Sequence, residues 1–267
     1  MNDSDLLDLD GQVALVTGAG RGAGRAIALE LARHNAGGVA VNDFIGERAE
    51  AVAEEIRAMG VPALAVPFDV SDIEAVRAAN AAIKEKLGAA TILVNNAGNA
   101  GPTEDIGFSD MFWDEDPSTW GKFFATNMFG VMNACHTFIP NMVEAKRGRV
   151  VTIVSDAGRV GEARLAAYAT AKAGAAGFVR AIAKEAGRWG ITCNAISLST
   201  LEPPLPPEEL AEYLSSDRAR KHTSHYVIRR YGKPEDVAGM AAFLCSGAAA
   251  WITGQTYPVN GGYSFAV

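Results

Sequence analysis

Residues 17–24 read Thr17-Gly18-Ala19-Gly20-Arg21-Gly22-Ala23-Gly24, and they join a short apolar run to a longer stretch with helical periodicity. Glycines at a strand-to-helix turn let the backbone approach a pyrophosphate, whose charge the helix N-terminus then stabilises. A glycine triplet alone is a weak signal, but in this position it is typical of a dinucleotide-binding α/β fold. The residues expected to contact the cofactor here are Gly18, Gly20, Arg21, Gly22, Ala23 and Gly24.

An acidic residue, Asp43, closes the next apolar run. Its carboxylate can accept both hydroxyl groups of an adenosine ribose, whereas a 2′-phosphate would meet a like charge. Arg21 could instead attract that phosphate, but no Arg or Lys directly follows Asp43. We therefore expect NAD as the cofactor, with NADP as the less favoured alternative.

Short β-rich runs alternate with longer Ala-rich stretches from end to end, as in a parallel sheet with helices on both faces. No repeat or linker divides the 267 residues, so we expect one domain over residues 1–267. Strands are expected at Gln12–Thr17, Val39–Asp43, Ala63–Pro67, Thr91–Asn95, Arg149–Ser155, Ile191–Ser197 and Thr256–Val259. Helices are expected at Gly22–Asn35, Gly46–Met59, Asp72–Leu87, Pro117–Lys146, Ala167–Trp189 and Pro234–Ser246.

Two stretches, residues 99–119 and 199–231, break this alternation. Both follow the carboxyl ends of predicted strands, where ligands bind in open α/β sheets. Their aromatic residues and Met111 either pack the loops or line an apolar substrate pocket under a mobile lid. These residues are Phe108, Met111, Phe112, Trp113, Tyr213, His222, His225 and Tyr226.

The composition excludes several classes of protein. A net charge of -7 disfavours nucleic acid or an anionic membrane as the main partner. Residues 1–11 lack the features of a signal peptide, and no apolar run approaches the ~20 residues of a spanning helix. The cysteines have no metal-ligand spacing, which indicates buried reduced thiols and no metal. We expect a cytoplasmic enzyme or binding protein.

Tyr168, with Lys172 four residues on and Ser155 thirteen residues before, supplies the groups needed to move a proton off an alcohol. On a helix, the phenol and the ammonium share one face. At ~4 Å and an effective dielectric constant of ~20 their interaction is worth roughly 4 kcal/mol. It would lower a tyrosine pKa from ~10 toward ~7, which suits a general acid/base. The same pair also occurs on solvated helix edges, and the other motifs favour the catalytic interpretation.

These residues resemble the classical short-chain dehydrogenase/reductase family over nearly the whole chain. The resemblance implies a single Rossmann-like, doubly wound domain with a seven-stranded parallel sheet. The matching motifs are Thr17-Gly18-x-x-x-Gly22-x-Gly24, Asp69-Val70, Asn95-Asn96-Ala97-Gly98, the tetrad Asn127, Ser155, Tyr168 and Lys172, Gly148-Arg149-Val150-Val151, Ile252-Thr253-Gly254-Gln255 and Asn260-Gly261-Gly262.

The resemblance also implies a role for each tetrad residue. Tyr168 would exchange a proton with the substrate, and Ser155 would hydrogen-bond the substrate oxygen. Lys172 would lower the pKa of Tyr168 and bind the nicotinamide ribose, and Asn127 would hold a water. Further implied cofactor contacts are Asp69, Val70, Asn95, Asn96, Ala97, Gly98, Tyr168, Lys172 and Leu201.

The sequence departs from the family pattern after the sixth strand. Leu198 and Ser199 replace the usual Pro-Gly, and Pro203 replaces the Thr that helps bind the nicotinamide carboxamide. Ser199 or Thr200 could substitute as the hydrogen-bonding partner. Asp156 stands where a small or neutral residue is expected. It either faces the substrate or, as we favour, forms a salt link with Arg159 or Arg164.

The helix after Tyr168 is rich in Ala and Gly, which favours a homo-oligomer, a dimer or tetramer, although burial within one subunit explains the same pattern. The expected function is hydride transfer between NAD and a small-molecule secondary alcohol or ketone of moderate, largely apolar character. The alternatives are an NADPH-dependent 3-oxoacyl thioester reductase and a non-catalytic dinucleotide-binding sensor or scaffold.

Overall fold

A computed structural model of the chain describes residues 5–98 and 111–265. It contains a seven-stranded parallel sheet in the order β3-β2-β1-β4-β5-β6-β7. The order reverses between β1 and β4, which is the switch point where ligands bind in such sheets. The predicted doubly wound α/β fold is thereby confirmed. The strands are β1 (Val13–Val16), β2 (Gly38–Val41), β3 (Ala63–Ala65), β4 (Ala90–Asn95), β5 (Gly148–Ser155), β6 (Ile191–Leu198) and β7 (Thr256–Val259).

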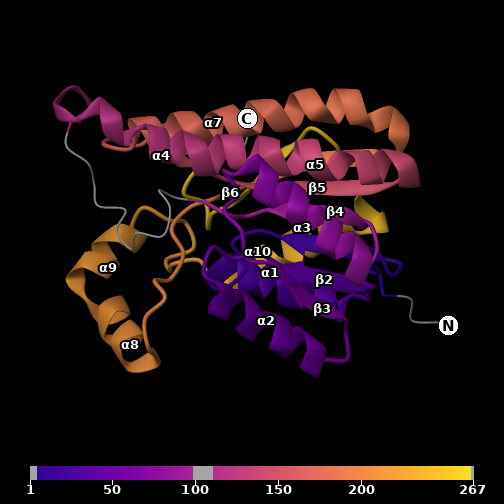
Figure 1. The fold of residues 1–267 in the computed structure, drawn as a ribbon. Coiled ribbons are helices and arrows are strands. Elements are labelled where there is room, and N and C mark those ends of the chain that lie inside the picture. Colours follow the sequence, from indigo (N-terminus) through magenta and orange to yellow (C-terminus); the bar gives the residue numbers. More distant parts are fainter. Residues whose placement is uncertain (1–4, 99–110, 266–267) are drawn as a thin grey trace.

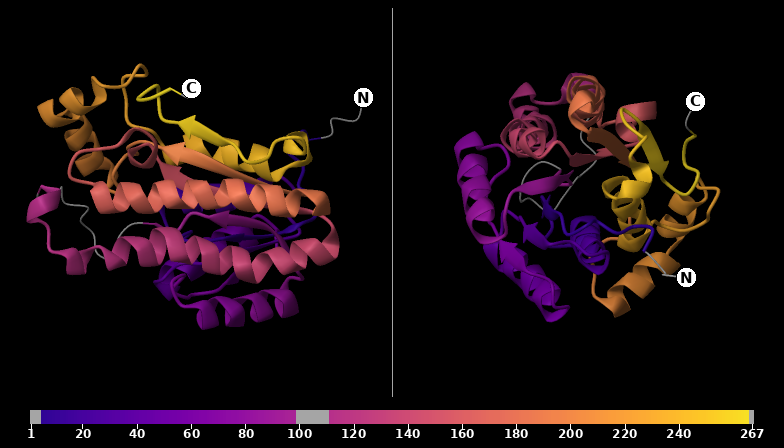
Figure 2. Two further views of the ribbon diagram at one scale, coloured as in Figure 1. Left: turned by 90° about the horizontal axis from the view of Figure 1, so that it is seen from above. Right: turned by 90° about the vertical axis from the view of Figure 1, so that its right-hand side faces the viewer.

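Helices cover both faces of the sheet, with α1, α2 and α10 on one side and α3, α5 and α7 on the other (Figures 1 and 2). Successive residues of a strand point to opposite faces. Accordingly, Ile92 and Val94 of β4 join the first core, and Leu93 joins the second. The helices are α1 (Gly22–Arg33), α2 (Gly46–Ala58), α3 (Ile73–Lys86), α4 (Gly121–Phe124), α5 (Gly130–Ala145), α6 (Ala157–Val160), α7 (Ala166–Ala186), α8 (Pro207–Ser215), α9 (Asp217–Thr223) and α10 (Pro234–Cys245).

The continuous helix predicted over residues 117–146 is wrong. A 3₁₀ turn, η2 (Pro117–Thr119), and the short α4 lead into a π-helical segment, η3 (Ala125–Phe129), before α5 begins. The Gly130 N–H bonds the carbonyl of Ala125, five residues back. Gly130 also packs so closely on Val70 that an added Cβ would lie 2.6 Å from its Cγ2. Since π-bulges recur at functional sites, this segment, which holds Asn127, marks the site's edge.

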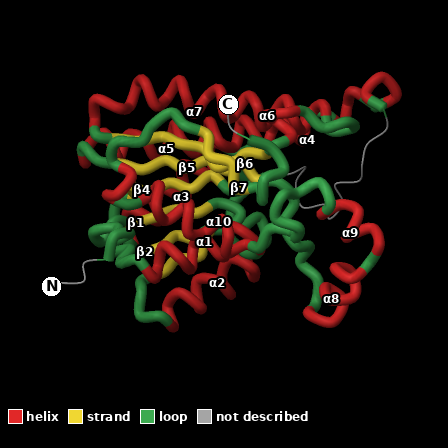
Figure 3. Tube along the Cα trace, turned by 180° about the vertical axis from the view of Figure 1, so that it is seen from behind, coloured by secondary structure: helices red, strands yellow, loops and turns green. Residues whose placement is uncertain are grey.

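Residues 199–231 were expected to be a loop, and the structure instead contains α8 and α9 there. These helices lie beyond the carboxyl end of β6, apart from the layers around the sheet (Figure 3). We call residues 199–231 the lid. Signals for both helices were present, because α8 begins with Pro207 and two glutamates and Ser216 caps α9. α8 also carries Leu210, Tyr213 and Leu214 at helical spacing, although none of its residues is buried.

The structure also bears on the predictions about cysteines and membrane spans. Cys135, Cys193 and Cys245 are buried and free, as expected. In the described part of the chain, no helix is both long and apolar enough to cross a membrane. Phe108 and the first part of the stretch 99–119 lie outside the described residues.

Candidate active site

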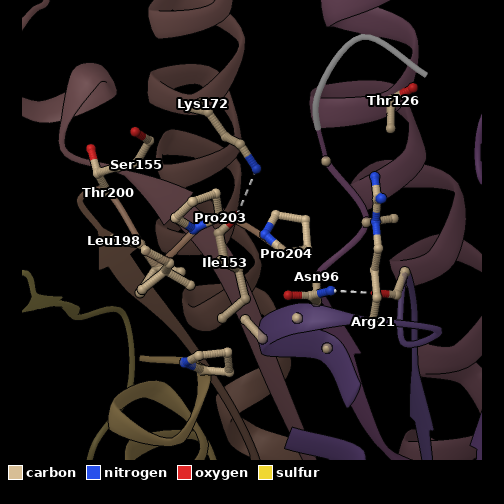
Figure 4. Close-up of a pocket in the computed structure, with 18 of the residues that line it drawn as sticks. Arg21, Asn96, Thr126, Ile153, Ser155, Lys172, Leu198, Thr200, Pro203 and Pro204 are labelled. Atoms are coloured by element: carbon tan, nitrogen blue, oxygen red, sulfur yellow. Dashed lines mark hydrogen bonds between the residues drawn. The ribbon is translucent and has the colours of Figure 1, made fainter. Parts of the chain in front are cut away.

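A cavity of about 770 Å³ opens at the carboxyl ends of the strands, between the sheet and the lid. Figure 4 shows that residues from both halves of the chain meet around it, with Ser155 and Lys172 toward one side and Arg21 and Asn96 toward the other. Most of the predicted site residues line this cavity. They are Gly18, Arg21, Gly22, Ala23, Gly24, Asp43, Asp69, Val70, Asn96, Ala97, Gly98, Ser155, Tyr168, Lys172 and Leu201.

The glycine turn is built for close approach. A Cβ on Gly18 would lie 2.8 Å from Ala97 Cα, and one on Gly24 would lie 2.3 Å from the carbonyl oxygen of Gly18. Gly22 is different, because its φ of +56° favours glycine while the space beside it is open. The turn therefore packs tightly against β4 on one side and leaves room for a ligand at the start of α1.

The side chain of Asn96 fixes this turn to β4. Its Nδ2 donates to the carbonyl oxygens of Thr17 and Gly18 at 3.0 and 2.9 Å. The Thr17 hydroxyl accepts in turn from the N–H groups of Asn96 and Ala97. Asn95 points away, since its Nδ2 lies 3.3 Å from Thr152 Oγ1 inside the core. The predicted cofactor contact of Asn95 is corrected: its side chain supports β4 and β5 and does not line the cavity.

Asp43 lies at the end of β2, and its carboxylate is held from two sides. One oxygen accepts from the Gly20 N–H and the other from the Ile45 N–H, each at 3.0 Å. Gly20 therefore acts through Asp43 and does not line the cavity itself. Arg48, on the first turn of α2, lies beside Asp43 and lines the cavity together with Arg21. Sequence reasoning missed Arg48, although a cation soon after an acidic strand end was a usable signal.

Lys172 and Asn127 of the tetrad meet beside Gly98, and Tyr168 forms a hydrogen bond with Ser155. Ser155 ends β5, and Tyr168 and Lys172 lie on the first turns of α7. A Cβ added to Gly98 would lie 3.1 Å from Lys172 Nζ and 3.2 Å from Asn127 Oδ1. Asn127 is buried behind the cavity, where its Nδ2 donates to the carbonyl of Phe123 at 2.9 Å.

The expected effect of Lys172 on Tyr168 is wrong for this structure. Burial raises the pKa of the Tyr168 phenol above its ordinary value, a hydrogen bond with Ser155 lowers it, and the charge of Glu162 raises it further. Lys172 donates from Nζ to the carbonyl of Ile153 at 2.9 Å, and burial lowers its own pKa to about 8. Desolvation dominates because both groups lie away from water.

The altered stretch after β6 is bound to the end of α9 and the residues that follow it, within the lid. The Ser199 hydroxyl lies 2.6 Å from the Tyr226 hydroxyl, which also accepts from the Thr200 N–H at 3.2 Å. Thr200 Oγ1 lies 3.1 Å from His222 Nε2. Both hydroxyl groups that could have replaced the missing carboxamide contacts are therefore engaged by Tyr226 and His222.

Asp156 forms the salt link that the sequence favoured, with its Oδ1 3.0 Å from Arg159 Nη1. Several other cavity residues gave no sequence signal, because no periodicity fixes the conformation of the segments that carry them. They are Thr126, Glu162, Leu165, Arg218 and Tyr231. Among the residues that the structure describes, no three His, Cys, Asp or Glu side chains gather as a metal site would require.

The residues present fit a nicotinamide dinucleotide. The glycine turn leaves space at the N-terminus of α1, where a pyrophosphate would be stabilised. Asp43 lines one part of the same cavity, and Lys172 and Tyr168 line another. One continuous cavity thus joins the glycine turn and Asp43 to Ser155, Tyr168 and Lys172.

Comparisons with known proteins agree with this geometry. A family model described as enoyl-(acyl carrier protein) reductase matches residues 18–264. A 3-oxoacyl-[acyl-carrier-protein] reductase of Staphylococcus aureus is 36% identical over 251 residues, which cover 93% of this chain and 96% of that protein. A 7alpha-hydroxysteroid dehydrogenase of Escherichia coli is 33% identical over 262 residues, 98% of each chain.

Solved structures show the same likeness. A gluconate 5-dehydrogenase from Burkholderia cenocepacia, in complex with NADP and tartrate, has a TM-score of 0.86 and 29% identity over 98% of this chain and 99% of that one. A 7 alpha-hydroxysteroid dehydrogenase complexed with NADH and 7-oxo glycochenodeoxycholic acid has a TM-score of 0.85 and 33% identity over 98% of both chains. The fold, the order of motifs and these relatives together show that the chain belongs to the classical short-chain dehydrogenase/reductase family, whose members are oxidoreductases that act on CH–OH and keto groups.

Proposed function

We propose that the protein transfers a hydride between NAD and a secondary alcohol or ketone of moderate size and largely apolar character. The observation that carries this proposal is the meeting of Ser155, Tyr168 and Lys172 in one cavity with Asp43 and the glycine turn. When bound there, the dinucleotide supplies the nicotinamide carbon that accepts or donates the hydride.

In the oxidation direction, the ionised Tyr168 oxygen removes the alcohol proton. The Ser155 hydroxyl donates a hydrogen bond to the same substrate oxygen and stabilises its developing charge. Lys172 is held by the Ile153 carbonyl, and its Nζ lies beside Gly98, where the remaining N–H groups can bind the nicotinamide ribose. The tetrad role of Asn127 is to hold a water that connects this proton path to solvent.

The choice of NAD rests on Asp43. Its carboxylate would accept from ribose hydroxyls and repel a 2′-phosphate. Arg21 and Arg48 act in the opposite sense, because both line the cavity and would attract a phosphate. The structural relatives include one complexed with NADP and one complexed with NADH, so the family likeness favours neither cofactor.

The apolar substrate is supported by apolar residues of the cavity. The cavity lining carries Leu165, Leu198, Pro203 and Pro204, and its charged residues include Glu162, Glu202 and Arg218. The second candidate is reduction of a 3-oxoacyl thioester, which the 36% identity to a 3-oxoacyl-[acyl-carrier-protein] reductase favours. A sensor without turnover is disfavoured, because it has no physical need of both Tyr168 and Lys172.

We also propose a homo-oligomer in the cytoplasm. Buried alanines of α7, including Ala171 and Ala175, pack within the subunit, but Ala173 on the same helix is exposed. The neighbouring α5 side carries Met132, which is 39% exposed, next to Phe129, which is 49% exposed. An apolar face of this kind supports association of two copies. Sedimentation of the purified protein tests this, and a single monomeric species would contradict it.

The function is tested by mixing the protein with NAD or NADP and a panel of secondary alcohols, and following the absorbance of the reduced nicotinamide. The reverse reaction is followed with the matching ketones and with a 3-oxoacyl thioester. Turnover of apolar secondary alcohols with NAD is expected. Turnover confined to the 3-oxoacyl thioester and NADPH would replace the leading candidate with the second.

A further inference from the structure

Asp156, the residue directly after Ser155, is a buried carboxylate with four side-chain partners. Its Oδ1 accepts from Arg159 Nη1 at 3.0 Å and from Ser197 Oγ at 2.7 Å. Its Oδ2 accepts from Asn260 Nδ2 at 2.6 Å and from Ser264 Oγ at 3.0 Å. The side chain is 2% exposed. Such a fully paired carboxylate holds its partners in one arrangement, because breaking any bond leaves a buried charge unsatisfied.

Two of these partners belong to the C-terminal segment, which we define as residues 260–265. Arg159 reaches the same segment, since its guanidinium donates to Ser264 Oγ at 3.0 Å and to the carbonyl of Phe265 at 2.9 Å. Asn260 closes the segment on itself through a bond from Nδ2 to the carbonyl of Ser264. Asp156 and Arg159 therefore bind the C-terminal segment to the end of β5.

The C-terminal segment also contacts the lid. The Ile228 N–H donates to the carbonyl of Gly261 at 2.8 Å. The ring of Tyr263 packs against that of Tyr226 at a centroid distance of 5.3 Å, and Tyr226 holds Ser199 and Thr200. A continuous set of contacts thus runs from Asp156 through the C-terminal segment to the stretch that follows β6.

Ser155 lies at the fixed end of this network. The Asp156 N–H extends the β5–β6 pairing by bonding the carbonyl of Leu198 at 2.9 Å. On the other side, the Ala157 N–H donates to the Ser155 hydroxyl at 3.2 Å. The direction of the Ser155 side chain is therefore set by the turn that Asp156 anchors.

We propose that Asp156 is a positioning residue for the oxidoreductase reaction. Through Arg159 and the C-terminal segment it holds both the Ser155 hydroxyl and the lid in the arrangement that receives the substrate. This inference rests on the proposed function, in which Ser155 binds the substrate oxygen. Asp156 itself is occupied by protein partners, so it orients the site and does not exchange the proton.

The test compares Asp156→Asn, Ser264→Ala and the double variant with the wild type. Asp156→Asn removes the charge at nearly unchanged size, whereas Ser264→Ala keeps every charge and trims only one partner. Glu74→Gln is the matched control, because Glu74 forms an exposed i,i+3 pair with Arg77 on α3, away from the cavity. The readouts are kcat, the KM values for alcohol and NAD, and amide hydrogen exchange over residues 260–265.

For Asp156→Asn, kcat is expected to fall roughly 10- to 100-fold, the scale of a small misplacement of a reacting group, while the KM for NAD stays unchanged. Ser264→Ala is expected to lower kcat in the same direction by a smaller factor. The double variant should lose less than the product of the two single losses, because the residues act in one network. Exchange over residues 260–265 should accelerate in both single variants and not in the control.

If Asp156→Asn shows faster exchange over residues 260–265 but keeps the kcat of the wild type, the positioning role is overturned and Asp156 is only a structural link. Strictly multiplicative losses, or unchanged exchange, would overturn the network itself. If Asp156→Asn does not fold, Ser264→Ala and its exchange decide the question. A wild type inactive toward every alcohol and ketone would instead overturn the proposed function, and the positioning role with it, while exchange would still report whether Asp156 fastens the segment.

Discussion

Lys172 donates a hydrogen bond from Nζ to the carbonyl oxygen of Ile153 at 2.9 Å, two residues before Ser155 on the same strand. This bond fixes the ammonium to β5, next to Gly98. Burial lowers the pKa of Lys172 to about 8, so placing a charge there destabilises the fold. The buried ammonium of Lys172 therefore lowers the stability of the folded protein, and the pH dependence of unfolding can measure this effect.

Replacing Lys172 with Met should change how stability depends on pH. An unfolded lysine has a pKa near ~10.4, so between about pH 8 and 10 the unfolded chain binds more protons at this position than the folded one. The unfolding free energy of the wild type should therefore rise with pH in this window, by about 2 kcal/mol more than that of Lys172→Met between about pH 7.5 and 9.5. Denaturant titrations at the two pH values test this, and parallel changes in both proteins would contradict it.

The variant Glu162→Gln should shift the pH dependence of alcohol oxidation. The negative charge of Glu162 raises the pKa of Tyr168, and oxidation needs the ionised phenol. Removing that charge should move the rising limb of the kcat/KM profile to lower pH, by less than about one unit because burial is the larger cause. Glu202→Gln is the control, since Glu202 lines the cavity but is not one of the groups that shift Tyr168. Equal profiles for wild type and Glu162→Gln would refute this expectation.

Removing the carboxylate of Asp43 should change the cofactor preference. In Asp43→Ala a 2′-phosphate no longer meets a like charge, and Arg21 and Arg48 remain to attract it. The ratio of kcat/KM for NADP to that for NAD should rise at least about tenfold, which corresponds to about 1.4 kcal/mol. Asp43→Asn also removes the charge but keeps one acceptor oxygen, for the N–H group of either Gly20 or Ile45, and so serves as a milder control for loosening of the glycine turn. An unchanged ratio would show that the arginines set the choice.

Loss of the Tyr226 hydroxyl should weaken the lid. This hydroxyl binds Ser199 Oγ and the Thr200 N–H, which lie on the stretch that replaces the usual carboxamide contacts. Tyr226→Phe should raise the KM for alcohol several-fold, since each lost hydrogen bond is worth about 0.5–1.5 kcal/mol. Tyr257→Phe, on β7, is the control. Equal KM values in steady-state assays would mean that the lid is held by its packing alone.

Much of the architecture could be predicted from the sequence, because buried parallel strands and amphipathic helices carry strong periodic signals. The residues around Gly22, Ser155 and Tyr168 were found for the same reason, since each lies at the end of such an element. The π-helical segment at Asn127 was missed, and Gly130 at its end packs against Val70, which is distant along the chain. No local pattern records a contact of that kind.

The electrostatics of the site could be predicted least well. The spacing of Tyr168 and Lys172 placed them correctly, but the pair energy assumed a partly solvated surface. In the structure Lys172 is 4% exposed, and burial is the largest cause of the pKa shift of each group, raising that of Tyr168 and lowering that of Lys172. The conformation of the lid could not be predicted either. Its contacts, such as that between His222 and Thr200, join residues that have no regular spacing along the chain.

The central claim is that Tyr168 exchanges the proton of a secondary alcohol beside a bound dinucleotide. The most direct test is the rate at which NAD is reduced by the best alcohol of the panel, compared between the wild type and Tyr168→Phe, with Tyr213→Phe as the control in the same cavity. We expect Tyr168→Phe to lose roughly 10²- to 10⁴-fold in kcat with NAD binding unchanged. A Tyr168→Phe variant that turns over as fast as the wild type would contradict the account.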